Sequence, residues 1–180
     1  MNSTSLVAAA VAASFIVHPS IAADDLLQEV IVTAMPIESA TGDLTQPVSV
    51  MTGDELRVRV APSLGETLAQ EPGVSSTFYG PAASRPVIRG LGGDRVQVLA
   101  DGLAALDVSG LSEDHAVAVE PALAEQIEVV RGPATLLYGS GAAGGVVNVV
   151  TARLHDERRD DIGGVAEVRG DSALGERAGA

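Results

Sequence analysis

The chain has 180 residues, with 24 acidic side chains, 11 arginines, no lysine and a formal net charge of −13. Such a chain lacks the basic patch with which proteins hold nucleic acid or an anionic membrane surface. The absence of cysteine excludes disulfides, thiolate catalysis and thiolate metal sites. Aromatic residues are too few for the interfacial girdles of a membrane β-barrel; they are Phe15, Phe78, Tyr79 and Tyr138.

The N-terminus carries an uncharged apolar run, Leu6–Val17, that is too short for a transmembrane helix. Small residues at Ser20 and Ala22 follow it, in the pattern that a signal peptidase reads. The preceding residues lack the Lys or Arg that is usual there. We nevertheless predict a signal peptide over residues 1–22, cleaved after Ala22.

The next segment with strand-forming residues is EVIVTA, which follows an acidic leader. An isolated run of this kind is typical of a strand that pairs with a partner, or of an ordinary first strand of the domain. Its residues are Glu29, Val30, Ile31, Val32, Thr33 and Ala34.

The central part of the chain predicts short elements separated by turns. Ser63 and Glu66 have the spacing of a helix-capping box, and Pro72-Gly73 ends the helix that they begin. Asp101-Gly102 is a common turn pair. The expected elements are a strand at Pro47–Met51, a helix at Ser63–Glu71, a strand at Val87–Arg89, a turn at Gly92–Asp94 and a strand at Val96–Ala100.

The last part of the predicted domain follows an exposed loop, Ser109–Val119. One helical turn is expected within Glu120–Gln126, with Pro121 in its first position. β-Branched residues predict strands at Ile127–Val130 and Val146–Thr151, with a helical turn at Pro133–Tyr138 closed by Gly139. Short mixed strands and short helices indicate an α+β fold.

A glycine-rich run at residues 139–144 satisfies the G-x-G-x-x-G pattern of dinucleotide-binding folds. That motif requires a helix after the glycines, whereas GVVNVVT predicts a strand. We therefore do not expect nucleotide binding, and no constellation of catalytic residues indicates an enzyme.

The sharpest chemical feature is Glu113-Asp114-His115, with Asp107 shortly before it. Carboxylate and imidazole together suit Zn²⁺ or a similar divalent ion. The alternative is an exposed acidic loop with a solvated histidine.

Four blocks in order resemble the plug domain of TonB-dependent outer-membrane receptors, which import chelated iron, cobalamin or metals. They are EVIVTA at 29–34, LGETLAQEPGV at 64–74, RPVIRGLGGDRVQVLADGL at 85–103 and IEVVRGPATLLYGSGAAGGVVNVVT at 127–151. The resemblance implies an α+β plug that works in transport and has a small ligand or metal ion as its cargo.

The resemblance also implies partners and site residues. Glu29–Ala34 is similar to the TonB box, which pairs with a strand of the inner-membrane protein TonB. Asp114 and His115 are similar to plug zinc ligands of zinc receptors, so zinc is expected as the transported ligand, with no resident cofactor. Arginines are expected to pair with acids of the plug or of the protein's own β-barrel; they are Arg89, Arg95 and Arg131.

The expected organisation is a signal peptide (1–22), a TonB box and linker (23–46), a plug domain (47–152) and a linker with a possible first barrel strand (153–180). The C-terminal β-barrel of the family is absent, so we expect a fragment. The complete protein would lie in the outer membrane, and the fragment alone in the periplasm. Two alternatives remain: a siderophore or cobalamin receptor, and a stand-alone periplasmic binding or signalling module that uses residues 29–34 for strand addition.

Overall fold

A computed structural model describes residues 31–34, 39–40, 47–80, 82–106, 108–151, 153, 166, 168–171 and 176–179. The predicted signal peptide lies outside the described residues, and nothing tests the predicted domain boundaries. In the described part of the chain, no helix is long and apolar enough to cross a membrane.

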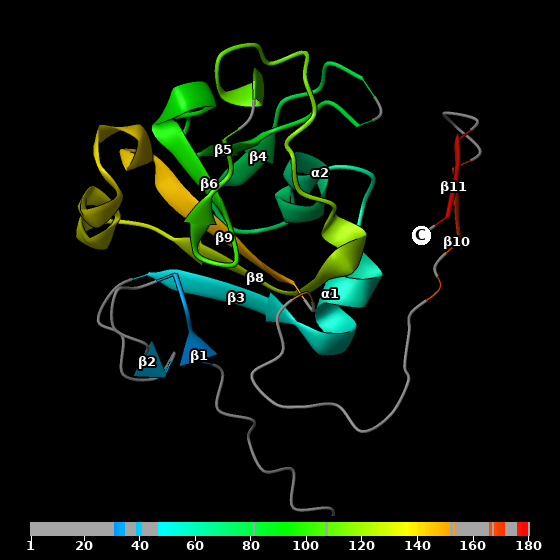
Figure 1. The fold of residues 1–180 in the computed structure, drawn as a ribbon, viewed down its shortest axis with the longest axis horizontal. Coiled ribbons are helices and arrows are strands. Elements are labelled where there is room, and N and C mark those ends of the chain that lie inside the picture. Colours follow the sequence, from blue (N-terminus) through cyan, green and yellow to red (C-terminus); the bar gives the residue numbers. More distant parts are fainter. Residues whose placement is uncertain are drawn as a thin grey trace, which may run out of the picture.

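The domain is built on a five-stranded sheet with the strand order β3-β8-β9-β6-β7 (Figure 1). β8 pairs antiparallel with both β3 and β9, whereas β6 pairs parallel with β9 and antiparallel with β7. The strands are β3 (Val48–Thr52), β6 (Val96–Ala100), β7 (Leu103–Ala104), β8 (Ala124–Val130) and β9 (Gly145–Thr151). The mixed sheet confirms the α+β prediction.

Side chains of the central strands alternate between two buried faces. Ile127 and Val129 of β8 point to one core, and Val130 points to the other. In β9, Val147 and Val149 belong to the first core and Val146 to the second. Both faces are covered, which explains why these strands read as nearly continuous apolar runs.

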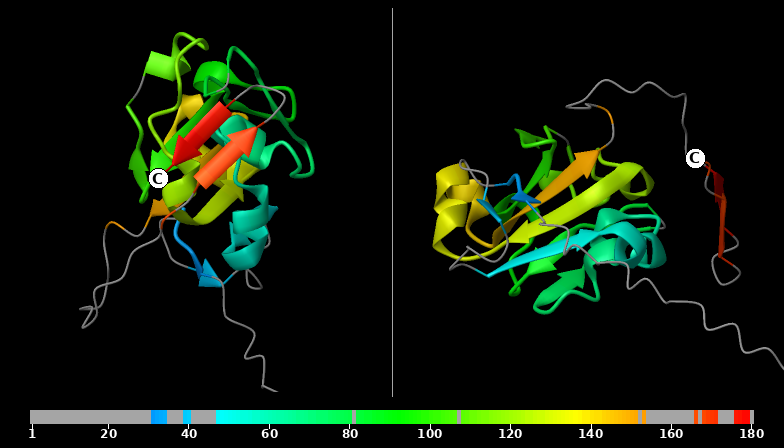
Figure 2. Two further views of the ribbon diagram at one scale, coloured as in Figure 1. Left: turned by 90° about the vertical axis from the view of Figure 1, so that its right-hand side faces the viewer. Right: turned by 90° about the horizontal axis from the view of Figure 1, so that it is seen from below.

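The first face is covered by two short helices and a two-stranded hairpin (Figures 1 and 2). They are α1 (Gly53–Arg59), α2 (Leu64–Leu68), β4 (Val74–Ser76) and β5 (Pro86–Ile88). Leu64 and Leu68 lie one helical turn apart and are both buried in this core. The burial of one apolar side per element holds this layer on the sheet.

The predicted capping residue begins α2 as expected. The Ser63 hydroxyl accepts a hydrogen bond from the Glu66 N–H at 3.4 Å and donates to the Glu66 carboxylate at 2.8 Å. The helix ends at Leu68 rather than at Glu71, because the chain leaves it through tighter bonds such as Ala69 N–H to Glu66 O. Neither α1 nor β4 was predicted.

The second face carries 3₁₀ turns and the most N-terminal described residues (Figure 2). These elements are η5 (Pro133–Tyr138), η6 (Ser140–Ala142), β1 (Ile31–Val32) and its antiparallel partner β2 (Ser39–Ala40). The helical turn predicted at Pro133–Tyr138 is confirmed, with Gly139 at φ +85° behind it. The glycine run leads into β9 and not into a helix, also as predicted.

Three further 3₁₀ turns and one hairpin complete the described elements. The turn predicted at Gly92–Asp94 is present as the 3₁₀ turn η2. The helical turn predicted within Glu120–Gln126 is present as η4, which is short because β8 already begins at Ala124. The elements are η2 (Gly93–Arg95), η3 (Val108–Gly110), η4 (Pro121–Leu123), β10 (Val168–Asp171) and β11 (Glu176–Gly179). β10 and β11 pair with each other and not with the five-stranded sheet.

Candidate functional site

The loop that follows η3 brings the predicted ligand pair Asp114 and His115 together. His115 Nδ1 lies 2.9 Å from Asp114 Oδ1, and the two side chains are 53 % and 66 % exposed, respectively. The Ser112 hydroxyl donates to the same carboxylate. This hydrogen bond, and then the one from His115, hold the pKa of Asp114 below its usual range. An ionised carboxylate and an accessible imidazole are therefore presented side by side.

The third member of the trio, Glu113, is hydrogen-bonded to a different side chain. Its carboxylate accepts a hydrogen bond from the Tyr79 hydroxyl at 2.6 Å. That hydrogen bond and the charge of Glu113 raise the pKa of Tyr79 above its usual value. Within the described residues, no three His, Asp or Glu side chains are close enough to hold a metal ion together. Asp107 lies outside the described residues.

A buried arginine fixes the base of this loop. Arg85 is 4 % exposed and donates from Nη1 to the Ser109 hydroxyl. Its Nη2 lies 3.4 Å from the Gly93 carbonyl and 3.3 Å from the Val96 carbonyl. Arg85 thus ties η3 to the start of β6, and it was not predicted to have a role.

The described part of the predicted TonB box is docked on the second face of the sheet. Glu29 and Val30 lie outside the described residues, while Ile31–Ala34 form β1 and the two residues after it. We call residues 31–34 the N-terminal segment. Val32 and Ala34 are fully buried among side chains of the second core. The structure thus places these residues against their own domain.

One buried carboxylate holds the N-terminal segment. Glu128 of β8 is 0 % exposed. Its Oε1 accepts the Thr33 main-chain N–H at 2.7 Å and the Thr33 hydroxyl at 3.0 Å, and its Oε2 accepts the Ala34 N–H at 2.6 Å. Gln126 Nε2 donates to Oε1 at 2.6 Å. The buried charge is therefore surrounded by donors, as burial requires.

Two further side chains complete this contact. Asn148, the cross-strand partner of Glu128 in β9, donates from Nδ2 to Glu128 Oε2 and to the Thr33 hydroxyl, both at 3.1 Å. The Tyr138 hydroxyl donates to the Ala34 carbonyl. Burial, and then the charge of Glu128, raise the pKa of Tyr138, so that its hydroxyl stays a donor at neutral pH.

Sequence reasoning did not identify Glu128 or Asn148. The signal was present: each is a lone polar residue inside an apolar run, IEVV and VVNVV. Such a residue in a strand buried on both faces needs hydrogen-bond partners, and here they come from the neighbouring strand and from the N-terminal segment. Thr33 and Ala34 lie 95 and 94 residues away from Glu128, and no local pattern in the sequence indicates a contact over such a distance.

The three arginines singled out by the sequence differ in their surroundings. Arg89 and Arg95 are exposed, and Arg89 has φ +52°. Arg131 is buried, and its Nη1 donates to the Ser49 hydroxyl at 3.0 Å. Its Nε and Nη2 have no hydrogen-bond partner among the described residues. Desolvation lowers the pKa of its guanidinium.

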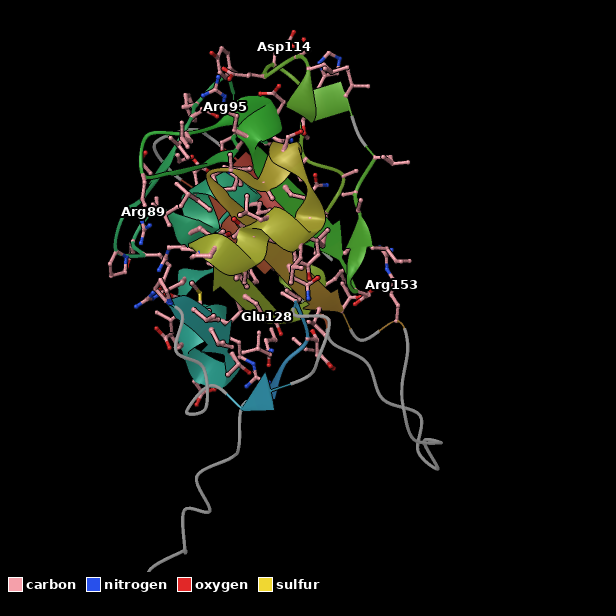
Figure 3. The ribbon with its side chains drawn as sticks, turned by 90° about the vertical axis from the view of Figure 1, so that its left-hand side faces the viewer. Arg89, Arg95, Asp114, Glu128 and Arg153 are labelled. Carbon is pink, nitrogen blue, oxygen red and sulfur yellow. The ribbon has the colours of Figure 1, made fainter. Side chains whose placement is uncertain are left out.

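The exposed loop and the N-terminal segment lie far apart. Figure 3 shows Asp114 at one end of the domain and Glu128 towards the opposite end, beside β1. The sheet lies between them. A ligand on the loop and a partner on the N-terminal segment would therefore approach from different sides.

The chain is similar to proteins of one kind. Residues 40–146 match the TonB-dependent receptor plug domain. A hemin receptor of Yersinia pestis is 36 % identical over 129 residues, which are 70 % of this chain and 18 % of that protein.

Two solved structures share both sequence and fold. A mutant of the ferric enterobactin receptor from Pseudomonas aeruginosa, in complex with enterobactin, is 30 % identical with a TM-score of 0.52, covering 63 % of this chain and 18 % of that one. The alcaligin receptor from Bordetella pertussis is 27 % identical with a TM-score of 0.51, covering 72 % and 22 %. The chain spans about a fifth of the length of these relatives. It belongs to the TonB-dependent receptor plug domain family.

Proposed function

We propose that this chain is the plug of an outer-membrane receptor that takes up an iron chelate, either hemin or a ferric siderophore, with energy delivered through TonB. The observation that carries this proposal is the family match over residues 40–146, which includes the strands β3, β6, β7 and β8, the start of β9 and the exposed loop. The relatives named for hemin, enterobactin and alcaligin support iron chelates as the cargo class. The proposed activity is transport and not catalysis.

The proposed cargo contact is the loop with Asp114 and His115. An exposed imidazole can ligate the iron of hemin, and the adjacent carboxylate can orient that imidazole through the 2.9 Å hydrogen bond. A ferric siderophore would need no ligand from the protein, because the chelator already fills the coordination sphere. Dependence on His115 therefore distinguishes the two cargoes.

Zinc is the second candidate cargo, and the same pair supports it. Imidazole and carboxylate are ordinary zinc ligands, but a zinc site usually has four ligands. The described residues offer two at this place. The remaining ligands would have to come from elsewhere in the complete protein, and the zinc prediction remains a prediction.

We place the TonB contact at Glu29–Ala34. Strand addition relies on main-chain hydrogen bonds, which a short β-branched segment provides. Because Ile31–Ala34 are docked on the plug, the residues before them would be the first that TonB can reach.

The test is an uptake assay with the complete gene that contains this sequence, expressed in a Gram-negative host that lacks its own hemin and siderophore receptors. We expect uptake of radiolabelled hemin or of a ferric siderophore, and loss of that uptake when the host's TonB is deleted. Uptake of zinc alone would replace the iron chelate by the second candidate. No uptake of any of the three would overturn the proposal.

A single substitution tests the cargo contact. His115→Ala in the complete receptor should weaken the binding of hemin, or of zinc, by more than the roughly 10–100-fold that loss of a hydrogen-bond partner behind a ligand costs, because one direct ligand is removed. His155→Ala is the matched control, since it also removes one imidazole and His155 is not among the residues proposed for the contact. Binding is measured by titration of the purified receptor. An unchanged affinity for both hemin and zinc would remove His115 from the site.

A further inference from the structure

The contact between Glu128 and the N-terminal segment is built differently from an ordinary strand pairing. Among the residues that the structure describes, Ile31 and Val32 pair with Ala40 and Ser39 in a two-residue ladder. The two residues that follow donate their main-chain N–H groups to one carboxylate. Hydrogen bonds to an ionised acceptor are stronger than neutral ones, and stronger still when water is excluded. The main-chain N–H groups of Thr33 and Ala34 are therefore both held by one carboxylate.

The residue that carries this carboxylate lies in the middle of the sheet. Glu128 and Asn148 are directly opposite each other in the antiparallel pair of β8 and β9. Leu99 of β6 is the partner of Asn148 on its other side, and Val50 of β3 is the partner of Glu128. Force applied to the N-terminal segment would therefore act on a row of paired residues that runs across β3, β8, β9 and β6.

The opposite side of the segment is held as well. The Tyr138 hydroxyl bonds the Ala34 carbonyl, and Val32 and Ala34 pack against Val130 and Val146. Both the donor and the acceptor side of the segment are thus occupied by the domain. Such a segment resists peeling, because several bonds must break together before it moves.

We propose that Glu128 and Asn148 form a mechanical anchor, through which tension on the chain before residue 31 enters the central strands β8 and β9. Without the anchor, the N-terminal segment would peel away and leave the sheet intact. With it, the segment and the two strands yield together. The role of TonB as the source of tension rests on the proposed function, whereas the anchor itself rests on the hydrogen bonds of Glu128.

The anchor is tested by pulling single molecules of the 180-residue chain. The chain has no cysteine, so handles attached at Gln28→Cys and Arg153→Cys are unique. For the otherwise unaltered chain we expect one rupture that extends the N-terminal segment and the sheet together. For Glu128→Gln we expect an additional early rupture at lower force, which extends only the chain before β3. A carboxamide carries no charge and turns one acceptor oxygen into a donor.

A control variant and a second test variant accompany the pulling experiment. Glu125→Gln alters an exposed carboxylate on the same strand and should leave the trace unchanged. Asn148→Ala removes the donor to both Glu128 and the Thr33 hydroxyl, so it should also produce the early rupture if Glu128→Gln does not fold. An early rupture in the unaltered chain, at the same force as in both variants, would overturn the anchor.

Uptake by the complete protein supplies a second readout. Glu128→Gln should leave the affinity for the cargo unchanged and lower the TonB-dependent uptake rate. Unchanged uptake in this variant would overturn the role of the anchor in transport. If the unaltered protein takes up no cargo, the proposed function fails, while the pulling result still decides whether the anchor exists.

Discussion

Arg131 is a buried cation, and the described residues do not supply hydrogen-bond acceptors for all of its guanidinium nitrogens. Among the described residues, its guanidinium donates one hydrogen bond, to Ser49, and has two buried nitrogens without a partner. Glu128 shows the opposite case, a buried anion with a donor for every oxygen. Removing an unsatisfied buried group can stabilise a domain, whereas removing a satisfied one leaves its partners unpaired.

We therefore predict that Arg131→Met raises the free energy of unfolding of this chain by about 1–3 kcal/mol, because burying unpaired N–H groups is unfavourable. Arg57→Met is the control; Arg57 is 80 % exposed, and the change should stay within about 0.5 kcal/mol. Urea unfolding measures both. A fall in stability for Arg131→Met would mean that the guanidinium has partners beyond the described residues.

At the scale of elements, α2 depends on a close approach to the hairpin β4–β5. Gly65 lies in the helix, and a Cβ at this position would come within 2.6 Å of the Ser76 and Ser84 hydroxyl oxygens and 2.8 Å of the Arg85 main-chain carbon. Glycine is unfavourable in a helix, yet here only its missing side chain allows the contact. The hairpin carries Arg85, which in turn fixes the loop before Asp114.

Gly65→Ala should accordingly lower the free energy of unfolding by about 1–3 kcal/mol through overpacking, in spite of a gain in helix propensity of about 1 kcal/mol. Gly110→Ala, where a Cβ would meet nothing within 4 Å, should stay within about 0.5 kcal/mol. Thermal unfolding followed by circular dichroism distinguishes them. A more stable Gly65→Ala would show that the hairpin moves aside freely.

The strands β3, β6, β8 and β9, the Ser63 cap and the helical turn before the glycine run could be predicted because their causes are local. β-Branched runs indicate strands, and Ser63 and Glu66 are three residues apart. α1 was missed because Thr52 makes no side-chain cap and Gly53 precedes the acidic first turn with φ +57°. The hydrogen bonds from Thr33 and Ala34 to the Glu128 carboxylate could not be predicted, because they join residues that are distant in sequence. Asp114 and His115 were predicted as a pair, and the structure brings them within hydrogen-bond distance.

For the whole molecule, the dominant property is the net charge of −13. Like charges repel more strongly in the compact state than in the expanded chain, so self-repulsion opposes folding. Surface ion pairs such as Arg57–Asp54 offset little of it. The free energy of unfolding should therefore depend on how strongly dissolved salt screens the repulsion between the acidic side chains.

Raising NaCl from low to moderate concentration should increase the melting temperature of the chain by about 2–4 °C, which corresponds to about 1 kcal/mol at this length. Differential scanning calorimetry measures it. Sucrose at equal osmolality, which does not screen charge, is the control for a general solvent effect. A melting temperature that falls with NaCl would mean that attractive charge pairs outweigh the repulsion.

The position of β9 has a consequence for the order in which the domain is assembled. β9 comes last along the chain among the five strands of the sheet, yet it lies at the centre, between β8 and β6. Parallel pairing with β6 requires the whole stretch between Ala100 and Gly145 to be in place. During synthesis from the N-terminus, β3 with β8 and β6 with β7 can form only two separate halves until Thr151 has emerged. Joining them is then a late, non-local event, of the kind that makes folding slow.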